Sequence, residues 1–110
     1  MKTLAEALEK TIQDKVDSIK YFIDNDFVAT KAIRMVKKET TLSEKSWQKV
    51  LDKCVSLNII EKRFAVINDE TGINHITFSD ESEASNKARL MSEIHYSTYK
   101  VEERYYNVAN

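Results

Sequence analysis

The sequence predicts a mainly α-helical protein with a small β-hairpin, and three observations lead to this fold class. Apolar residues recur at spacings of three and four over most of residues 3–57, which is the period of one helix face. The period changes to two over residues 60–78, a stretch that holds the only glycine, Gly72. The spacing of three and four returns after residue 80. Long helices are therefore expected near both ends of the chain.

Length and composition favour a single domain over residues 1–110, with helices and hairpin in residues 1–79 and a final helix in residues 80–108. A chain of 110 residues is too short for two independent cores, and it contains no proline and no Gly/Ser-rich linker. Cys54 is the only cysteine and cannot form an internal disulfide. The first residues are charged, and no run approaches the roughly 18 apolar residues of a membrane span. We expect a cytoplasmic protein without membrane insertion.

The first helix is expected from about Thr3 to Asn25. Thr3 and Glu6 have the S/T-x-x-E form of a capping box, and the cluster from Asp24 to Asp26 supplies a stop. The apolar stripe of this helix consists of Leu4, Leu8, Ile12, Val16, Ile19, Phe22 and Ile23.

Two shorter helices are expected next, from about Val28 to Lys38 and from about Glu44 to Leu57. The first projects basic side chains from its outer face, namely Lys31, Arg34, Lys37 and Lys38. The second carries an apolar face made of Trp47, Val50, Leu51, Cys54 and Val55. Ser43 is the expected N-cap of that helix. Because Trp47 lies in the apolar stripe, a core position is favoured for it over base stacking.

The β-hairpin is expected from residues rich in β-branched and aromatic side chains. These residues are Ile60, the run from Arg63 to Ile67, and the run from Ile73 to Phe78. The loop from Asn68 to Gly72 joins the last two runs, and Gly72 supplies the positive φ that other residues resist.

Charge is distributed unevenly along the chain, although the formal net charge is only −1. Residues 1–26 carry a net charge of −2, residues 27–63 of +5, and residues 64–110 of −4. Such a basic segment in an otherwise acidic protein can attract phosphates locally. The alternative is a solvated basic face on two surface helices.

Three helices followed by a hairpin resemble the winged helix-turn-helix superfamily over about residues 15–78. The passage LDKCVSLNIIEK carries the resemblance through Leu51, Val55, Leu57, Ile59 and Ile60. The resemblance implies a winged helix-turn-helix with long N-terminal and C-terminal helices, whose third helix enters the major groove of duplex DNA. Most members of the family regulate transcription or replication, and some bind only proteins.

The DNA-binding residues are expected near the start of the third helix and around it. Lysine and glutamine reach base edges or phosphates, serine bonds phosphate oxygens, and the helix N-terminus adds partial positive charge. Because Asp69 and Glu70 make the hairpin tip acidic, contacts from the wing are expected at its base, or from Asn74 and His75 on its return strand. The expected set is Lys31, Thr41, Ser43, Lys45, Ser46, Gln48, Lys49, Lys53, Lys62 and Arg63.

The last helix is expected from Asp80 to about Val108. Its apolar positions follow the a/d spacing of a heptad, namely Met91, Ile94, Thr98, Val101, Tyr105 and Val108. This spacing predicts pairing in a homodimer through Met91, Ile94, Thr98, Val101 and Tyr105, while packing on the same domain is the alternative. The arrangement resembles replication terminator proteins and PadR-like repressors, which implies a dimer whose two recognition helices bind half-sites about 34 Å apart.

Catalysis finds little support in the sequence. It holds no P-loop, no G-x-G-x-x-G, no G-x-S-x-G and no H-E-x-x-H motif. His75 and His95 have no metal-ligand spacing with Cys54 or with a carboxylate. We therefore expect no enzymatic activity, no cofactor and no metal.

Two functional hypotheses follow. The first is a small dimeric protein that binds double-stranded DNA and regulates transcription or replication. The second is a winged-helix protein-protein interaction module, an accessory or inhibitory protein that does not bind DNA. The small size is compatible with a phage or plasmid origin in either case.

Overall fold

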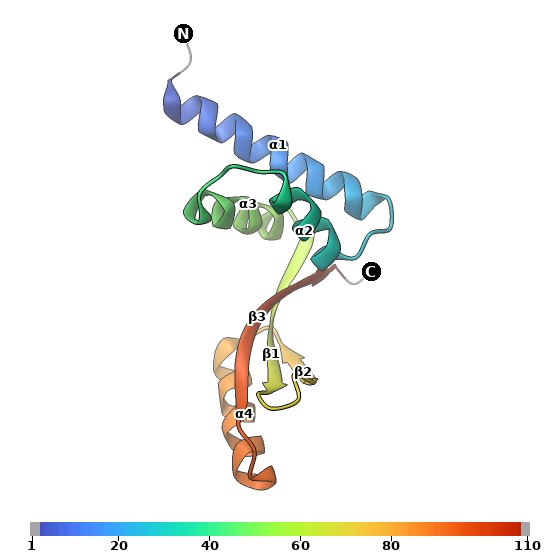
Figure 1. Ribbon diagram of the computed structural model, residues 1–110, viewed down its shortest axis with the longest axis vertical. Helices are drawn as coiled ribbons and strands as arrows, with labels where there is room; N and C mark the ends of the chain where they lie inside the picture. The colour runs from blue at the N-terminus through green and yellow to red at the C-terminus, as the bar shows by residue number, and fades with distance from the viewer. Residues whose placement is uncertain (1–2, 109–110) are drawn as a thin grey trace. The chain divides into compact units, whose positions relative to one another are not determined.

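The computed structural model describes residues 3–108, which form four helices and a three-stranded antiparallel sheet (Figure 1). The fold is therefore mixed α/β. The described chain divides into two compact units, residues 3–61 with 106–108, and residues 62–105. Residues 1–2 and 109–110, which the single-domain prediction included, lie outside the described residues.

The first unit holds three helices: α1 (Leu4–Asp24), α2 (Ala29–Lys38) and α3 (Glu44–Ser56). The predicted caps are confirmed, because the hydroxyl of Thr3 accepts from the Glu6 amide at 3.1 Å and that of Ser43 from the Ser46 amide at 3.2 Å. α1 contacts both α2 and α3. The buried residues of these helices are Ile12, Val16, Ile19, Ala29, Ala32, Val36, Trp47, Val50, Leu51 and Cys54. Trp47 is 3% exposed, which confirms its core position.

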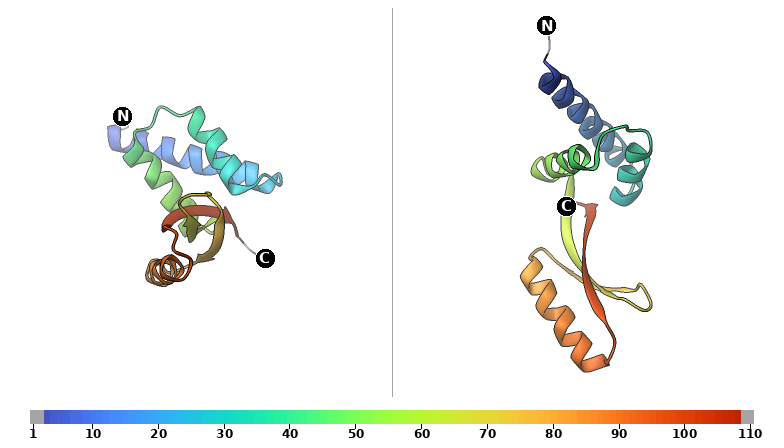
Figure 2. Two further views of the ribbon diagram at one scale, coloured as in Figure 1. Left: turned by 60° about the horizontal axis from the view of Figure 1, so that its bottom comes forward. Right: turned by 60° about the vertical axis from the view of Figure 1, so that its left-hand side comes forward.

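The second unit contains most of the sheet and one helix, α4 (Glu81–His95). The strands are β1 (Ile60–Asn68), β2 (Asn74–Phe78) and β3 (Tyr99–Asn107), in the order β2-β1-β3. β1 and β2 form the predicted hairpin, in which Phe64 pairs with Phe78 and the register shifts between Val66 and Ile67. α4 lies along the sheet in all views (Figures 1 and 2). Its alanines Ala84 and Ala88 pack with Phe64 and Val66.

The loop of the hairpin is closed by Asn68 and Gly72. The side-chain oxygen of Asn68 accepts from the amides of Glu70 and Thr71, at 2.9 and 3.1 Å. The amide of Gly72 donates to the carbonyl of Asn68 at 2.8 Å, and Gly72 has the predicted positive φ, +74°. The loop therefore forms as the sequence predicts.

The prediction of one helix over residues 80–108 is wrong in its second half. α4 ends at His95, and Tyr96 at the C-cap takes a left-handed conformation with φ of 53°. The hydroxyl of Ser92 then accepts from the amide of Tyr99 at 3.1 Å, and the Asp69 amide donates to the Thr98 carbonyl at 2.9 Å. The chain turns back here because β1 offers an open edge, on which Tyr99 and Val101 pack against the core of α4 and β1.

This correction removes the predicted heptad seam. Thr98, Val101 and Tyr105 lie outside the helix, so they share no helical face with Met91 and Ile94. Met91 is half-buried against its own core and Ile94 is 65% exposed. None of the helices described in residues 3–108 is long and apolar enough to cross a membrane.

Candidate nucleic-acid interface

The outer face of α2 is basic. Ala29, Ala32 and Val36 are buried, and at 100° per residue the opposite side carries Lys31, Arg34 and Lys38. All three are exposed, and within residues 3–108 none of them forms an ion pair. This helix thus presents three cations to solvent without a neutralising carboxylate.

Lys31 and Lys37 have local partners. The ammonium of Lys31 lies 5.4 Å from the centre of the Phe27 ring, which leaves its charge available to an anion. Lys37 pairs with Glu44, at the start of α3, with 3.3 Å between Nζ and Oε2. Both partners are largely exposed, so this ion pair contributes little stability, but it lowers the charge that Lys37 presents.

The outer face of α3 carries a row of lysines. Trp47, Val50, Leu51 and Cys54 define the buried side, and Lys45, Lys49 and Lys53 lie on the other side at intervals of four residues. The row spans about 12 Å along the helix axis, at 1.5 Å per residue. All three are exposed, and no ion pair within residues 3–108 involves them.

Polar side chains surround the beginning of this row. Thr41 and Ser43 are exposed in the segment before α3, and Ser46 is half-buried in its first turn. The amide of Gln48 donates to the carboxylate of Asp52 at 2.9 Å. This bond holds a side chain that was predicted to contact DNA, and Asp52 adds one negative charge to the lysine face.

Lys62 and Arg63, the expected contacts at the base of the wing, are engaged within the second unit. The guanidinium of Arg63 donates to the Thr77 hydroxyl at 2.8 Å and to the Thr77 carbonyl at 3.1 Å. Lys62 lies 4.0 Å from the Glu103 carboxylate and 5.7 Å from the centre of the Phe64 ring. Both side chains are half-buried. Their contacts favour a role in holding the sheet together.

Eight of the ten expected residues thus lie on the helices of the first unit or in the segment between α2 and α3. The other two, Lys62 and Arg63, lie in the sheet of the second unit. The expected set omitted Arg34 and Lys38, although both are exposed beside Lys31. The spacing of Lys31, Arg34 and Lys38, by three and four, is the sequence signal that identifies them as one face.

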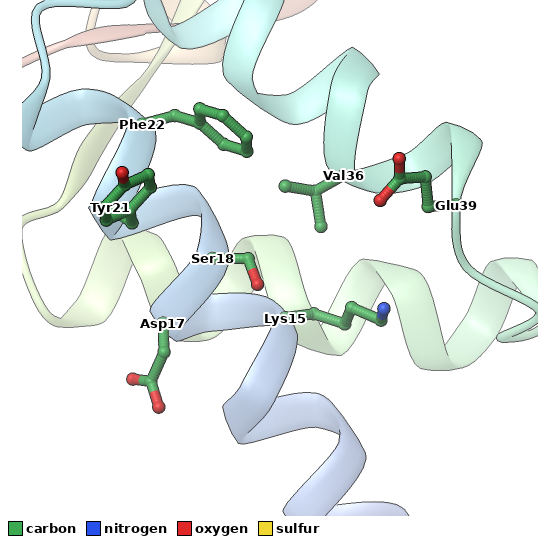
Figure 3. Close-up of a pocket in the computed structure, with 7 residues that line it drawn as sticks. All are labelled: Lys15, Asp17, Ser18, Tyr21, Phe22, Val36 and Glu39. Carbon is green, nitrogen blue, oxygen red and sulfur yellow. The ribbon is translucent and has the colours of Figure 1, made fainter.

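The surface of the first unit has several hollows, and two of them bear on function. One, of about 350 Å³, lies between α1 and α2, where Phe22 and Val36 form an apolar floor (Figure 3). Lys15, Asp17 and Glu39 supply the charges around it. The other, of about 490 Å³, is lined by Lys20, Ile23, Asp24, Asp26, Leu57, Asn58, Ile59, Asn107 and Val108.

Reactive groups are few in the described part of the chain. Residues 3–108 contain no group of three or more His, Cys, Asp or Glu side chains that could hold a metal ion. Burial raises the pKa of the Cys54 thiol to about 11, so the thiol stays protonated at neutral pH. His75 and His95 both contact the ring of Tyr99, at 5.3 and 6.2 Å between centres.

In comparisons with known proteins, no protein-family model, no curated protein and no solved structure matches the chain.

Proposed function

We propose that the chain is a DNA-binding protein related in architecture to the winged helix-turn-helix superfamily, and that it regulates transcription or replication by occupying a site on duplex DNA. The observation that carries this proposal is the row of Lys45, Lys49 and Lys53 on the outer face of α3, which forms no ion pair with any residue that the structure describes. The element order, three helices and then a hairpin, is that of the superfamily.

The surroundings of the row support the same function. Lys31, Arg34 and Lys38 form a second basic face on the preceding helix. Residues 27–63 have a net charge of +5, while the segments before and after them are acidic. A localised basic surface of this kind attracts phosphates and limits adsorption elsewhere. In the proposed complex α3 lies in the major groove, with Lys45 and Lys49 at base edges or phosphates.

Substitution of paired lysines tests the proposal. A labelled random duplex is titrated with the wild type at low salt, and binding is followed by fluorescence anisotropy. Lys45→Ala with Lys49→Ala should weaken binding about tenfold or more, because each lost phosphate contact removes counterion release. The matched control is Lys10→Ala with Lys87→Ala, since both of these lysines are exposed on other helices. Equal loss in the two double variants would contradict the proposal.

The alternative function is a protein-binding module, and exposed apolar side chains in the mainly polar hollow of about 490 Å³ favour it. Leu57 and Val108, which are 53% and 37% exposed, lie there with the half-buried side chains of Ile23 and Ile59. Exposed apolar side chains that line a hollow are typical of protein contacts. Absence of duplex binding even at low salt would support this alternative over the first.

A further inference from the structure

The hollow between α1 and α2 has an apolar end and a charged end, and all of it lies in the first unit. Lys15, Ser18 and Phe22 are spaced by three and four on α1, so they share one face of that helix. Val36 and Glu39 line the hollow from α2 and its C-cap. Figure 3 shows Phe22 and Val36 pointing toward each other, with the charged ends of Lys15 and Glu39 beyond Val36.

The charged end holds a cation and an anion that do not neutralise each other. Lys15 is half-buried, so part of its side chain is removed from water, and Glu39 is exposed. Among residues 3–108 neither charge has an ion-pair partner. The third charge on the rim, Asp17, accepts from the side-chain amide of Gln13 at 2.8 Å, and its carboxylate points away from Glu39 (Figure 3). Lys15 and Glu39 can therefore each bind a ligand group of opposite charge.

Two further features favour an ammonium group beside Glu39. The hydroxyl of Ser18 donates to the carbonyl of Asp14 at 3.0 Å, so its oxygen can still accept a hydrogen bond. Glu39 is the C-cap of α2, where the helix dipole favours a positive charge. The charged end thus offers one position for a carboxylate, at Lys15, and one for an ammonium, at Glu39.

We propose that this hollow binds a free α-amino acid with an aromatic or large aliphatic side chain. The side chain of the ligand lies against Phe22 and Val36, its carboxylate beside Lys15 and its ammonium beside Glu39. A simple acid would meet the charge of Glu39, and a simple amine that of Lys15, whereas a zwitterion satisfies both. The volume of about 350 Å³ lies at the low end of the roughly 300–1,000 Å³ of small-molecule sites, which suits a ligand of this size. This proposal does not depend on DNA binding.

A titration followed by amide chemical shifts in NMR tests the site with three probes. They are phenylalanine, phenylpropionate, which lacks the ammonium, and phenethylamine, which lacks the carboxylate. Phenylalanine should shift the amides that surround the hollow, with a dissociation constant of about 1 mM, because an open site of this size gives modest affinity. Each analogue should bind the wild type about tenfold more weakly, since it loses one charged hydrogen-bonding group.

Variants assign each charged group of the ligand to its residue. Lys15→Met should remove the preference for phenylalanine over phenethylamine, because no cation remains for the carboxylate. Glu39→Gln should remove most of the preference over phenylpropionate. The matched controls are Lys10→Met and Glu9→Gln, which are exposed on α1 outside the hollow and should keep both preferences. Because two probes are compared on the same variant, a general loss of stability cannot imitate these results.

Three results would overturn the proposal. The first is the absence of any shift around the hollow up to about 10 mM phenylalanine. The second is equal binding of the three probes to the wild type, which would show apolar contact alone. The third is an unchanged preference over phenethylamine in Lys15→Met, which would place the ligand carboxylate elsewhere.

Discussion

Asn107 caps the N-terminus of α2, although it lies 78 residues after Ala29 in the sequence. Its side-chain oxygen accepts from the Ala29 amide at 2.8 Å, and its side-chain amide donates to the Phe27 carbonyl at 3.1 Å. The N-cap residue Val28 has no side chain able to make such a bond. A distant residue therefore replaces a local cap, and no pattern along the sequence could have indicated it.

Removal of this cap should destabilise the protein. We expect Asn107→Ala to lower the free energy of unfolding by about 1 kcal/mol, the usual cost of a lost N-cap. Asn107→Asp should lose less, since a carboxylate still accepts from the Ala29 amide and favours the helix N-terminus. Urea denaturation measures both differences. Equal stability of Asn107→Ala and the wild type would show that water replaces the bond without cost.

The thiol of Cys54 gives a second test at this scale. Burial raises its pKa from 9.0 to about 11, so the folded state favours the protonated form. For a group whose folded pKa is raised, the contribution to stability is complete below the unfolded pKa and disappears as pH rises through the folded pKa. The difference in unfolding free energy between the wild type and Cys54→Ala should therefore be constant up to about pH 9 and shrink toward pH 11. A constant difference throughout this range would contradict the assigned burial.

At the scale of elements, the sequence predicts the first five elements well, places a helix at α4 that runs too far, and misses the strand β3. α1, α2 and α3 begin and end within one or two residues of the prediction, because Thr3, Ser43 and the cluster from Asp24 to Asp26 are local signals. The turn after His95 has no such signal. Helices often end at glycine, and here Tyr96 takes that conformation. The apolar spacing of three and four continues in the sequence beyond His95, where the helix ends, and this led to the prediction of a longer helix.

The candidate site was also predictable only in part. The lysine row of α3 follows from helical spacing alone, and the structure places it on the exposed face. The ion pair of Lys62 and the hydrogen bonds of Arg63 could not be predicted from spacing, because their partners Glu103 and Thr77 come from β3 and β2. Contacts between distant strands require the sheet register, and the sequence pattern predicted a helix where β3 lies.

Hydrogen exchange distinguishes a strand from a helix in the last segment. As an edge strand paired on one side only, β3 should protect alternate amides over residues 99–107. The amides of α4 beyond its first turn should be protected continuously up to residue 95. Continuous protection from residue 85 through 105, measured by NMR, would instead support one long helix.

At the scale of the whole molecule, the proposed DNA-binding surface belongs to one of the two units. The first unit carries the basic faces of α2 and α3, whereas the second holds Lys62 and Arg63 in contacts of its own sheet. Because phosphate contacts from the first unit carry the affinity, Lys87→Ala in the second unit should leave the dissociation constant for duplex DNA unchanged. Fluorescence anisotropy measures this constant, and a loss as large as that of Lys49→Ala would contradict the assignment.

The central claim is that the lysine row of α3 binds the phosphates of duplex DNA, and the salt dependence of binding tests it most directly. The dissociation constant for a random duplex is measured at several salt concentrations between 50 and 200 mM. If six cations of α2 and α3 contact phosphates, affinity should fall by roughly 10³ over this range. Lys45→Ala with Lys49→Ala should reduce the slope of log affinity against log salt by about two. A slope near zero, or one that this double variant leaves unchanged, would contradict the claim.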